Sequence, residues 1–513
     1  MYVGHFLKRN SLLYGNKTAL KSGGTSLTWA ELRNRTERLG RVLYGLGLNK
    51  GDRVSFLGYN SIPFIEFHLA LPSCGLVAVA LNFRMVAREL ETVLDNAECS
   101  ALIYSSAFAS KIDTIRDKLT YIKHFICLEG LRGNDLGYED LLKSGQQREI
   151  SPPASEDNPA CILYTSGTTG VPKGATMTHR NVLSSVKGII IEQGIIPENS
   201  FLLAAPLFHI APLEGMLAFL YQACTCVVLS QFDPVLVMET IQRERISHVF
   251  LVPRMISAIY EYPQSANYDL SCLSMIIYGG APISPEHLRK FIKRWGLKFF
   301  QHYGATESGL MTCMKRHEHQ VSDEGPDAKR LRSCGRQVID MEVEIKGEDG
   351  ERLATGEIGE VVVKADSVIP GYWRMSEETR ERIDNNGWYR TGDMGYLDEE
   401  GYLYLVDRKK YLIISGGENI YPAEVENVLH MMPQILEAAV IGVKDEKWGE
   451  TVKAVVVLKE GQSLTEEEVI EFCKLHLASY KKPTSVDFIP ALPRNAAGKV
   501  VKDVLKEKYA KKA

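Results

Sequence analysis

The 513-residue chain lacks the features that mark a secreted, disulfide-stabilised or nucleic-acid-binding protein. Its ten cysteines contain no Cys-x-x-Cys pair. This spacing argues against a disulfide framework or a zinc site and favours reduced, mostly buried thiols. The formal net charge is only −4, so no broad electrostatic attraction to nucleic acid is expected. We therefore expect a soluble, cytoplasmic globular protein with no nucleic-acid partner.

Long uninterrupted hydrophobic runs are also missing. The apolar run at the N-terminus is too short for a secretory signal. The most apolar region, residues 201–229, is interrupted by Pro206, His209, Pro212 and Gly215, whereas a membrane-spanning helix needs ~20 consecutive apolar residues. This region is expected to form a buried strand, a turn and a core helix. Peripheral contact with a membrane is left open, as is the oligomeric state, for which a homodimer is one option.

The length predicts more than one domain, at roughly 100–200 residues per domain. The first hundred residues alternate helix and strand patterns. Thr28-Trp-Ala-Glu31 is a capping box that begins a helix. Buried strands are predicted in the segments that follow and again further along the chain, at 54–57, 76–81, 101–104, 160–164, 247–253 and 275–278. This alternation predicts an α/β fold in which helices cover the faces of the sheets.

The pattern changes twice in the last third of the chain. Short alternating strands at 342–346 and 359–364 indicate a small β-rich subdomain. After Asp407 the elements become helices and strands of modest length. We predict a large N-terminal domain, residues 1–407, built of layered α/β sheets plus the small β subdomain. A small mobile α+β domain, residues 408–513, is predicted to follow it.

The most informative segment is residues 164–175, Tyr-Thr-Ser-Gly-Thr-Thr-Gly-Val-Pro-Lys-Gly-Ala. Its glycines allow the backbone to approach a ligand closely, its N–H and hydroxyl groups can surround anionic oxygens, and Lys173 adds a charge suited to phosphate. The alternative is a flexible Ser/Gly linker, but the apolar strand predicted just upstream would hold the loop rigid. The segment does not fit the usual P-loop spacing. It predicts a phosphate-binding loop of another kind, formed by Thr165, Ser166, Gly167, Thr168, Thr169, Gly170 and Lys173.

Three further segments are typical of ligand-binding loops. Tyr278-Gly-Gly-Ala-Pro282 would let a flat ring lie against the backbone. Tyr303-Gly-Ala-Thr-Glu-Ser308 offers a carboxylate, Glu307, of the kind that binds Mg²⁺ together with substrate phosphates, although taken alone Glu307 would more often be a solvated surface acid. Tyr389-Arg-Thr-Gly-Asp393 places a carboxylate where it could accept hydrogen bonds from two sugar hydroxyls.

These segments together resemble the adenylate-forming superfamily, which includes acyl-CoA synthetases, coumarate-CoA ligases, beetle luciferases and the adenylation domains of peptide synthetases. The resemblance covers essentially the whole chain and the motifs occur in the family's order. Asp407-Arg408, Ser415-Gly-Gly-Glu-Asn-Ile420 and Pro493-Arg-Asn-Ala-Ala-Gly-Lys499 extend it to the C-terminal region. Five motifs in register make a chance resemblance very improbable.

The resemblance implies a set of site residues by motif position. It implies that the 165–174 loop holds the β- and γ-phosphates of ATP, that Thr306 contacts phosphate and that Glu307 holds Mg²⁺. It also implies that Lys499 bridges the substrate carboxylate and the α-phosphate. Without its motif, Lys499 would be interpreted as a solvated lysine on a polar loop. The remaining implied contacts are with adenine, by Gly279, Gly280, Ala281 and Tyr303, and with ribose, by Asp393 and Arg408.

A second half-reaction is implied in which a thiol displaces AMP after the C-terminal domain rotates. By motif position the hinge is Lys410, where many CoA synthetases carry Asp and where luciferases and coumarate ligases carry Lys. Gly416 and Gly417 would then line the path of the thiol, because glycines suit close approach to a slender pantetheine arm. The implied cofactors are ATP, Mg²⁺ and CoA.

The chemical class of the substrate is narrowed by an acidic residue that the sequence lacks. Peptide-synthetase domains place an aspartate near the segment that matches Phe208-His-Ile-Ala-Pro212, whereas here no acid precedes Glu214. We therefore expect a carboxylic acid without an amino group. His209 matches a position beside the acyl pocket in acyl- and aryl-CoA synthetases, although a core histidine with one satisfied nitrogen is the alternative. The 445–450 and 480–483 segments resemble fatty acyl-CoA synthetases more than luciferases.

These observations predict an ATP-dependent acid:CoA ligase that acts on a medium- or long-chain fatty acid. The chain continues for 14 residues after Lys499, which leaves no room for a fused carrier domain and favours CoA as the thiol. The alternatives are an aryl or other carboxylic acid:CoA ligase, or a stand-alone ligase that loads a carrier protein. A nucleotide-binding regulatory protein is a more distant alternative, and the presence of both Glu307 and Lys499 argues against it.

Overall fold

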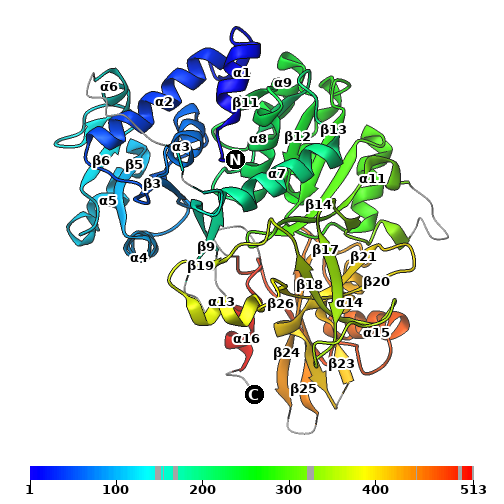
Figure 1. Cartoon of the computed structure of the whole chain (residues 1–513). Helices are drawn as coiled ribbons and strands as arrows, with labels where there is room; N and C mark the ends of the chain where they lie inside the picture. The colour runs from blue at the N-terminus through cyan, green and yellow to red at the C-terminus, as the bar shows by residue number, and fades with distance from the viewer. Residues whose placement is uncertain are drawn as a thin grey trace. The chain divides into compact units, whose positions relative to one another are not determined.

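The structure is a computed structural model that describes residues 1–144, 152–153, 155–165, 172–320, 329–416, 418–445, 448–494 and 500–510. These residues form two compact units. Unit 1 consists of Met1–Val343 with Val363–Tyr389, and unit 2 consists of Glu344–Val362 with Arg390–Ala513. The predicted α/β fold, with a large N-terminal sheet domain and a smaller C-terminal domain, is confirmed (Figure 1).

Unit 1 contains an eight-stranded sheet in which parallel strands form the centre. Its central strands are almost entirely buried, as expected when helices cover both faces of a parallel sheet. Its last two strands at one edge are antiparallel to their neighbours. In spatial order the strands are β19 (Gly371–Tyr372), β9 (Lys173–Thr178), β8 (Pro159–Thr165), β4 (Val77–Ala80), β3 (Arg53–Leu57), β5 (Cys99–Tyr104), β6 (His124–Cys127) and β7 (Leu136–Gly137).

The helix after the predicted capping box begins where the sequence predicts. Helix α2 (Trp29–Gly45) is capped by Thr28, whose side chain accepts from the Glu31 N–H while Glu31 bonds the Thr28 N–H in return. This is the predicted capping box. Helices α3 (Ile62–Ser73) and α4 (Ala87–Ala97) follow β3 and β4, so the predicted alternation of helix and strand is confirmed.

A second, nine-stranded sheet completes unit 1. In spatial order its strands are β16 (Arg336–Gln337), β15 (Gly309–Met314), β14 (Phe299–Ala305), β13 (Met275–Gly279), β12 (His248–Leu251), β10 (Ser200–Leu203), β11 (Thr225–Val228), β1 (Thr18–Ser22) and β2 (Thr25–Thr28). Helices α7 (His179–Gln193) and α8 (Ile210–Tyr221) pack against each other and against β15. The apolar region 201–229 therefore forms the predicted strand, turn and core helix.

No helix of the described residues is long and apolar enough to cross a membrane. All ten cysteines are free thiols, and all except Cys272 and Cys334 are buried. Burial raises the pKa of several of these thiols, including that of Cys99 to about 12, so they remain protonated at neutral pH. The cysteines therefore act as small core residues in this fold.

Unit 2 contains two smaller sheets. The first is four-stranded, with the order β17 (Glu342–Lys346), β18 (Gly359–Lys364), β20 (Tyr389–Leu397) and β21 (Leu403–Arg408). The second consists of β22 (Ile413–Ser415), β23 (Glu418–Ile420), β24 (Ile435–Asp445), β25 (Gly449–Leu458) and β26 (Ser485–Phe488). Helices α14 (Pro422–Leu429), α15 (Glu466–His476) and α16 (Lys502–Ala510) accompany it. The short alternating strands predicted at 342–346 and 359–364 are β17 and β18.

Candidate active site

The predicted phosphate loop connects two strands at the edge of the eight-stranded sheet. Strands β8 and β9 are antiparallel, and Thr165 pairs with Lys173 at the end next to the connecting loop. Ser166, Gly167, Thr168, Thr169 and Gly170 lie outside the described residues. Both ends of the loop are thus fixed by one strand pair, which is the rigid base that the apolar strand at 160–164 predicts.

Lys173 is almost completely buried, with 8% of the residue exposed. Its ammonium forms an ion pair of 2.5 Å with Oε1 of Glu378, on helix α13 (Ser376–Arg382). It also lies 5.6 Å from the centre of the Tyr372 ring, within the range of a cation–π contact. A buried ammonium needs such a partner, because desolvation of an unpaired charge is costly.

Glu307 lies in the turn between β14 and β15, next to Thr306, and is partly buried. The hydroxyl of Tyr372 donates to Glu307 Oε1 over 2.8 Å, and the N–H of Ile369 donates to the Glu307 carbonyl over 2.9 Å. Burial and the nearby Glu307 carboxylate raise the pKa of Tyr372 above its ordinary value, so this hydroxyl remains a donor. Lys173, Tyr372 and Glu307 therefore form one continuous set of contacts.

The oxygen ligands at this place fit a magnesium ion that is shared with a nucleotide. The described residues contain no cluster of three or more His, Cys, Asp or Glu side chains that could hold a metal. Mg²⁺ is usually bound through one or two carboxylates, several waters and the phosphates of its substrate. Glu307, with the hydroxyl of the adjacent Thr306, is a donor set of this kind.

The residues predicted to frame a flat ring lie at the carboxyl ends of two parallel strands. Gly279 ends β13 and pairs with His302 on β14, and Tyr303 follows His302. A Cβ at Gly279 would lie 2.4 Å from the His302 carbonyl oxygen, and Gly280 has φ +77°. Both positions therefore require glycine, and Ala281 follows in the exposed turn. This edge is where open α/β sheets bind their ligands.

His209 precedes the first turn of α8 and is partly buried. Its ring lies 4.3 Å from the Phe208 ring, which in turn meets Phe83 edge-on at 5.3 Å. These apolar neighbours are compatible with both interpretations of His209, a residue beside an acyl pocket and a core histidine. Its role stays a prediction.

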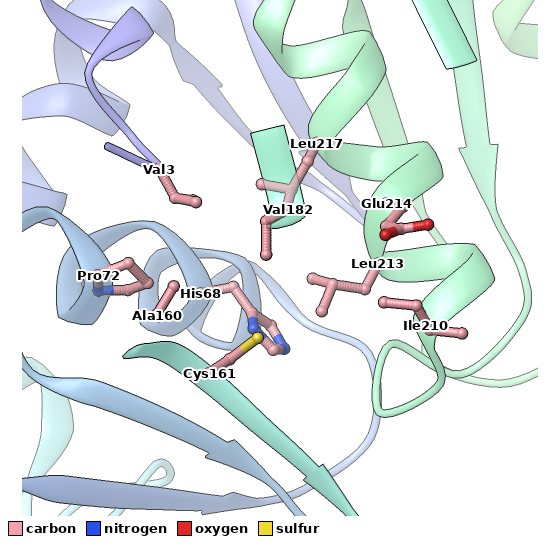
Figure 2. Close-up of a pocket in the computed structure, with 10 residues that line it drawn as sticks. All are labelled: Val3, His68, Pro72, Ala160, Cys161, Val182, Ile210, Leu213, Glu214 and Leu217. Carbon is pink, nitrogen blue, oxygen red and sulfur yellow. The ribbon is translucent and has the colours of Figure 1, made fainter. Parts of the chain in front are cut away.

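Glu214, on the same helix, is completely buried, and burial raises the pKa of its carboxyl to about 8 although a hydrogen bond from Ser185 opposes the shift. It lines a cavity of about 10 Å³, which is close to the smallest volume that holds one water molecule. Figure 2 shows that His68 of α3 faces this cavity from the opposite side, among apolar side chains. Burial lowers the pKa of His68 to about 3, so it is neutral. The sequence gives no sign of this pair.

Unit 2 brings together the two residues predicted to bind ribose. Asp393 on β20 and Arg408 on β21 are register partners, and Arg408 Nε lies 2.9 Å from Asp393 Oδ1. Lys410, the predicted hinge, lies in the short helix η5 (Lys409–Tyr411) and forms an ion pair of 2.8 Å with Asp503.

Gly416 has φ +59° in the turn that follows β22, and its N–H donates to the Trp448 carbonyl over 2.8 Å. A Cβ there would lie 2.8 Å from Cε3 of the half-exposed Trp448, so this position requires glycine. Gly417 and Lys499 lie outside the described residues.

The chain matches the family model of AMP-binding enzymes over residues 7–373 and that of the AMP-binding enzyme C-terminal domain over residues 424–499. It belongs to the AMP-binding enzyme family. The predicted resemblance to adenylate-forming enzymes is thereby confirmed. The first match covers the Thr/Gly loop, Thr306-Glu307 and the Tyr372 segment, and the second reaches Lys499.

Relatives in this AMP-binding family cover almost the whole chain. A feruloyl-CoA synthase of Amycolatopsis is 36% identical, over 99% of both chains. The long-chain-fatty-acid–CoA ligase FadD13 of Mycobacterium tuberculosis is also 36% identical, over 94% of this chain and 93% of its own. Among solved structures, ATP-bound MatB of Rhodopseudomonas palustris has a TM-score of 0.88 at 29% identity, over 99% of both chains.

Two residues of this AMP-binding enzyme that contact the predicted site were missed from the sequence. Tyr372 follows a glycine in a segment with no ligand-binding pattern, and Glu378 looks like an ordinary acid in the first turn of a helix. The pairing of β19 with β9 places both beside the phosphate loop. The signal that could have found them is the glycine before Tyr372: Gly371 has φ +154°, and a Cβ there would lie 2.6 Å from Thr379 Cγ2, so α13 packs closely on β19.

Proposed function

We propose that this AMP-binding enzyme is an ATP-dependent acid:CoA ligase. In the first half-reaction an oxygen of the substrate carboxylate attacks the α-phosphorus of ATP, which gives an acyl-adenylate and releases pyrophosphate. In the second, the thiol of CoA attacks the acyl carbon, which gives the thioester and releases AMP. The observation that supports this most directly is the set of contacts from Lys173 through Tyr372 to Glu307, which joins a buried cation and a carboxylate at the base of the Thr/Gly loop.

Each half-reaction assigns a task to particular residues. Thr165, Lys173 and the loop between them would bind the β- and γ-phosphates, and Glu307 would hold Mg²⁺, which neutralises phosphate charge when bound. Gly279–Ala281 and Tyr303 would hold adenine, and Asp393 with Arg408 would hold ribose. Lys499 would neutralise the charge that builds up when two anions meet. Gly416 and Gly417 would line the path of the thiol.

For the substrate we propose a medium- or long-chain fatty acid. The support comes from the apolar segment of β10 and α8, in which Glu214 is the first acid and is buried with its pKa raised to about 8. A feruloyl-CoA synthase and a fatty acid ligase are equally similar relatives at 36% identity. That equality makes an aryl or other carboxylic acid the second candidate, and loading of a carrier protein a third.

Exchange of labelled pyrophosphate into ATP tests the reaction class. Acid-dependent exchange is expected, because an acyl-adenylate forms reversibly with pyrophosphate as the leaving group. Release of ADP and phosphate instead would overturn the proposed mechanism. Comparing kcat/KM for octanoate, palmitate, benzoate and coumarate, with CoA as the acceptor, decides the substrate class. A strong preference for an aryl acid would overturn the fatty acid proposal and leave the ligase proposal intact.

We place the enzyme in the cytoplasm, since its ten free thiols suit a reducing compartment.

A further inference from the structure

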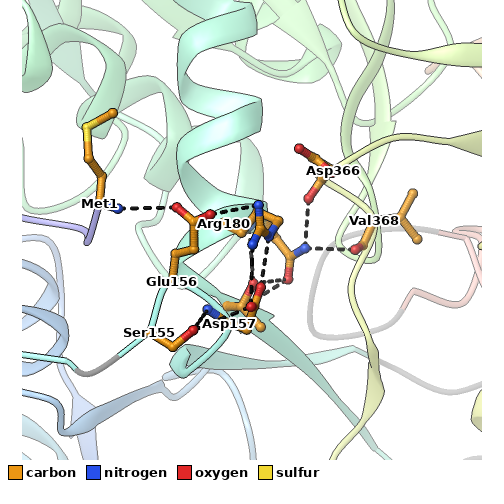
Figure 3. Close-up of polar contacts among 9 residues, drawn as sticks. Met1, Ser155, Glu156, Asp157, Arg180, Asp366 and Val368 are labelled. Carbon is orange, nitrogen blue, oxygen red and sulfur yellow. Dashed lines mark hydrogen bonds and ion pairs between the residues drawn. The ribbon is translucent and has the colours of Figure 1, made fainter.

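One segment of unit 1, residues 366–379, joins the two parts of the proposed metal–phosphate site. It is held at its beginning by helix α7, because the side-chain amide of Asn181 donates to the carbonyls of Asp366 and Val368, each over 2.8 Å. Figure 3 shows these contacts reaching Asp366 and Val368 from the first turn of α7. We call residues 366–379 the connecting segment.

The middle of the connecting segment is fixed by backbone bonds on two sides. On one side, Ile369 donates to the carbonyl of Glu307 over 2.9 Å. On the other, Tyr372 pairs with Ala175 on β9, and Trp373 donates to the Gly174 carbonyl over 2.7 Å. The segment therefore bridges the turn that bears Glu307 and the strand that begins with Lys173.

The end of the connecting segment folds back on its middle. The Tyr372 N–H bonds the hydroxyl of Thr379 over 3.0 Å. A Cβ at Gly371 would lie 2.6 Å from Thr379 Cγ2, so glycine is needed for α13 to pack this closely. This packing holds Glu378 against Lys173 while Tyr372 reaches Glu307.

We propose that Tyr372 is a positioning residue for metal–nucleotide binding, whose hydroxyl holds the Glu307 carboxylate in the orientation that accepts the metal ion. The inference rests on the proposed function, in which Glu307 holds Mg²⁺. The hydrogen bond engages Oε1 of Glu307, so in this proposal Oε2 is the oxygen that would bind the ion. A partly exposed carboxylate would otherwise exchange between rotamers, and fixing it before the ion arrives removes part of the entropic cost of binding.

Removing an outer partner of a metal-binding side chain typically weakens metal affinity about 10- to 100-fold. Tyr372→Phe deletes the hydroxyl and keeps the ring beneath Lys173. The matched control is Tyr44→Phe, because the Tyr44 hydroxyl donates to the Cys74 carbonyl over 2.8 Å in the same unit, on α2 and outside the proposed site.

Calorimetric titration with α,β-methylene-ATP and Mg²⁺, without acid or CoA, measures the proposed effect directly. Tyr372→Phe should bind the magnesium–nucleotide complex about tenfold more weakly, and it should bind AMP, which lacks the β- and γ-phosphates, as the unmodified protein does. Tyr44→Phe should change neither affinity. Equal weakening of AMP and of the magnesium complex in Tyr372→Phe would show a general structural defect and overturn the proposal.

Glu307→Gln separates this inference from the proposed function on which it rests. If Glu307→Gln binds the magnesium complex as the unmodified protein does, the assignment of Glu307 as the metal ligand is wrong, and the role of Tyr372 is wrong with it. If Glu307→Gln weakens binding and Tyr372→Phe does not, the metal assignment stands and the positioning role is overturned. Melting temperatures of all three variants confirm that each is folded at the titration temperature.

Discussion

At the scale of single residues, the Glu378 carboxylate neutralises the positive charge of Lys173 in the proposed phosphate site before any nucleotide binds. The ammonium is buried, whereas 29% of the Glu378 side chain is exposed. A phosphate group that binds the Lys173 ammonium must therefore displace the Glu378 carboxylate, which is already in contact with it. Glu378 thus weakens the attraction of Lys173 for phosphate and at the same time stabilises the free enzyme.

Glu378→Gln should lower the melting temperature and tighten pyrophosphate binding, because it leaves a buried cation without a compensating charge. The amide keeps an acceptor but loses the negative charge, so part of the roughly 1.5–3 kcal/mol contributed by a charged hydrogen bond should be lost. Part of this loss should be recovered when pyrophosphate supplies the missing charge. Thermal unfolding with and without saturating pyrophosphate measures both effects. An unchanged pyrophosphate-induced shift, compared with the unmodified protein, would contradict this account. Glu377→Gln, one residue earlier on α13, is the matched control.

Single residues were predicted from the sequence where a local motif specifies the chemistry. Lys173 and Glu307 each lie in a short segment whose glycines, hydroxyls and carboxylate point to a phosphate and a metal. Tyr372 and Glu378 lie in no such pattern, because their relation to the site arises from strand pairing across some two hundred residues. Glu214 was predicted only as the end of an apolar segment, since burial of its carboxyl depends on the packing of α8 against its neighbours.

At the scale of elements, helix α8 carries an acidic side chain into the protein interior. Glu214 is 2% exposed, and its Oε1 has no hydrogen-bond partner within the described part of the chain. In the unfolded chain a glutamate titrates near 4.5, whereas burial raises the pKa of Glu214 in the folded protein to about 8. The packing of α8 is therefore linked to pH.

The direction in which pH changes the stability of the fold follows from the proton that the folded state keeps on Glu214. Below pH 4.5 both states are protonated, and Glu214 costs no stability through its charge. Between pH 4.5 and about 8 the unfolded state releases the proton that the folded state keeps, so stability falls as pH rises, by up to about 1.4 kcal/mol per pH unit. Above pH 8 the folded state also ionises and the penalty is constant.

Glu214→Gln keeps the shape of the side chain and cannot ionise, so it should remove this penalty. The variant and the unmodified protein should unfold at similar denaturant concentrations near pH 5, and the variant should become progressively more stable up to pH 8. Urea unfolding at several pH values measures the difference. Glu239→Gln, at an exposed position on α9 (Pro234–Glu244), is the control. A stability difference that does not change with pH would contradict the buried-acid interpretation.

Helices and strands were largely predictable because burial leaves a local pattern. The capping box at Thr28 begins α2, the apolar runs at 76–81 and 247–253 contain β4 and β12, and the run at 275–278 covers all of β13 except Gly279. The order of strands in the sheets was not predictable in the same way. Strand β1 pairs with β11 across some two hundred residues, and β19 pairs with β9. No local period encodes such partners, so the sequence alone could not place the connecting segment.

At the scale of the whole molecule, the two compact units of the structure do not divide the chain where its sequence motifs predict a domain boundary. The sequence predicts a boundary between residues 407 and 408, with Lys410 as the hinge. The compact units instead group 344–362 and 390–407 with the C-terminal region, so Asp393 and Arg408 belong to the same unit. Rotation changes the arrangement of two domains, whereas these units are defined within a single arrangement. The 407–408 boundary and the hinge therefore remain predictions.

Two loops of the C-terminal region are proposed to serve different half-reactions. Lys499 is expected to act in adenylation, and the Gly416 turn, whose conformation requires glycine, is expected to act in thioester formation. One domain cannot present both loops to the same carboxyl group at once, which is why two orientations are needed. A variant that restricts the hinge should then separate the two half-reactions, while a variant that only removes the side chain should not.

Lys410→Pro fixes φ at the proposed hinge and removes its N–H. Lys410→Ala leaves φ free and removes the side chain, with its ion pair to Asp503 and its contact with the Tyr411 ring. We expect Lys410→Pro to form acyl-adenylate at a nearly normal rate and to transfer it to CoA roughly 10²-fold more slowly, the scale of a loss of reactive geometry. Lys410→Ala should lose little in either step, because its partner in the ion pair is exposed and such pairs contribute about 0–1 kcal/mol. Stopped-flow measurement of adenylate formation, and of thioester formation from supplied acyl-adenylate, gives both rates. If Lys410→Pro slowed adenylate formation and thioester formation equally, rotation about residue 410 would be contradicted. A restricted hinge should slow only the half-reaction that needs the rotated orientation.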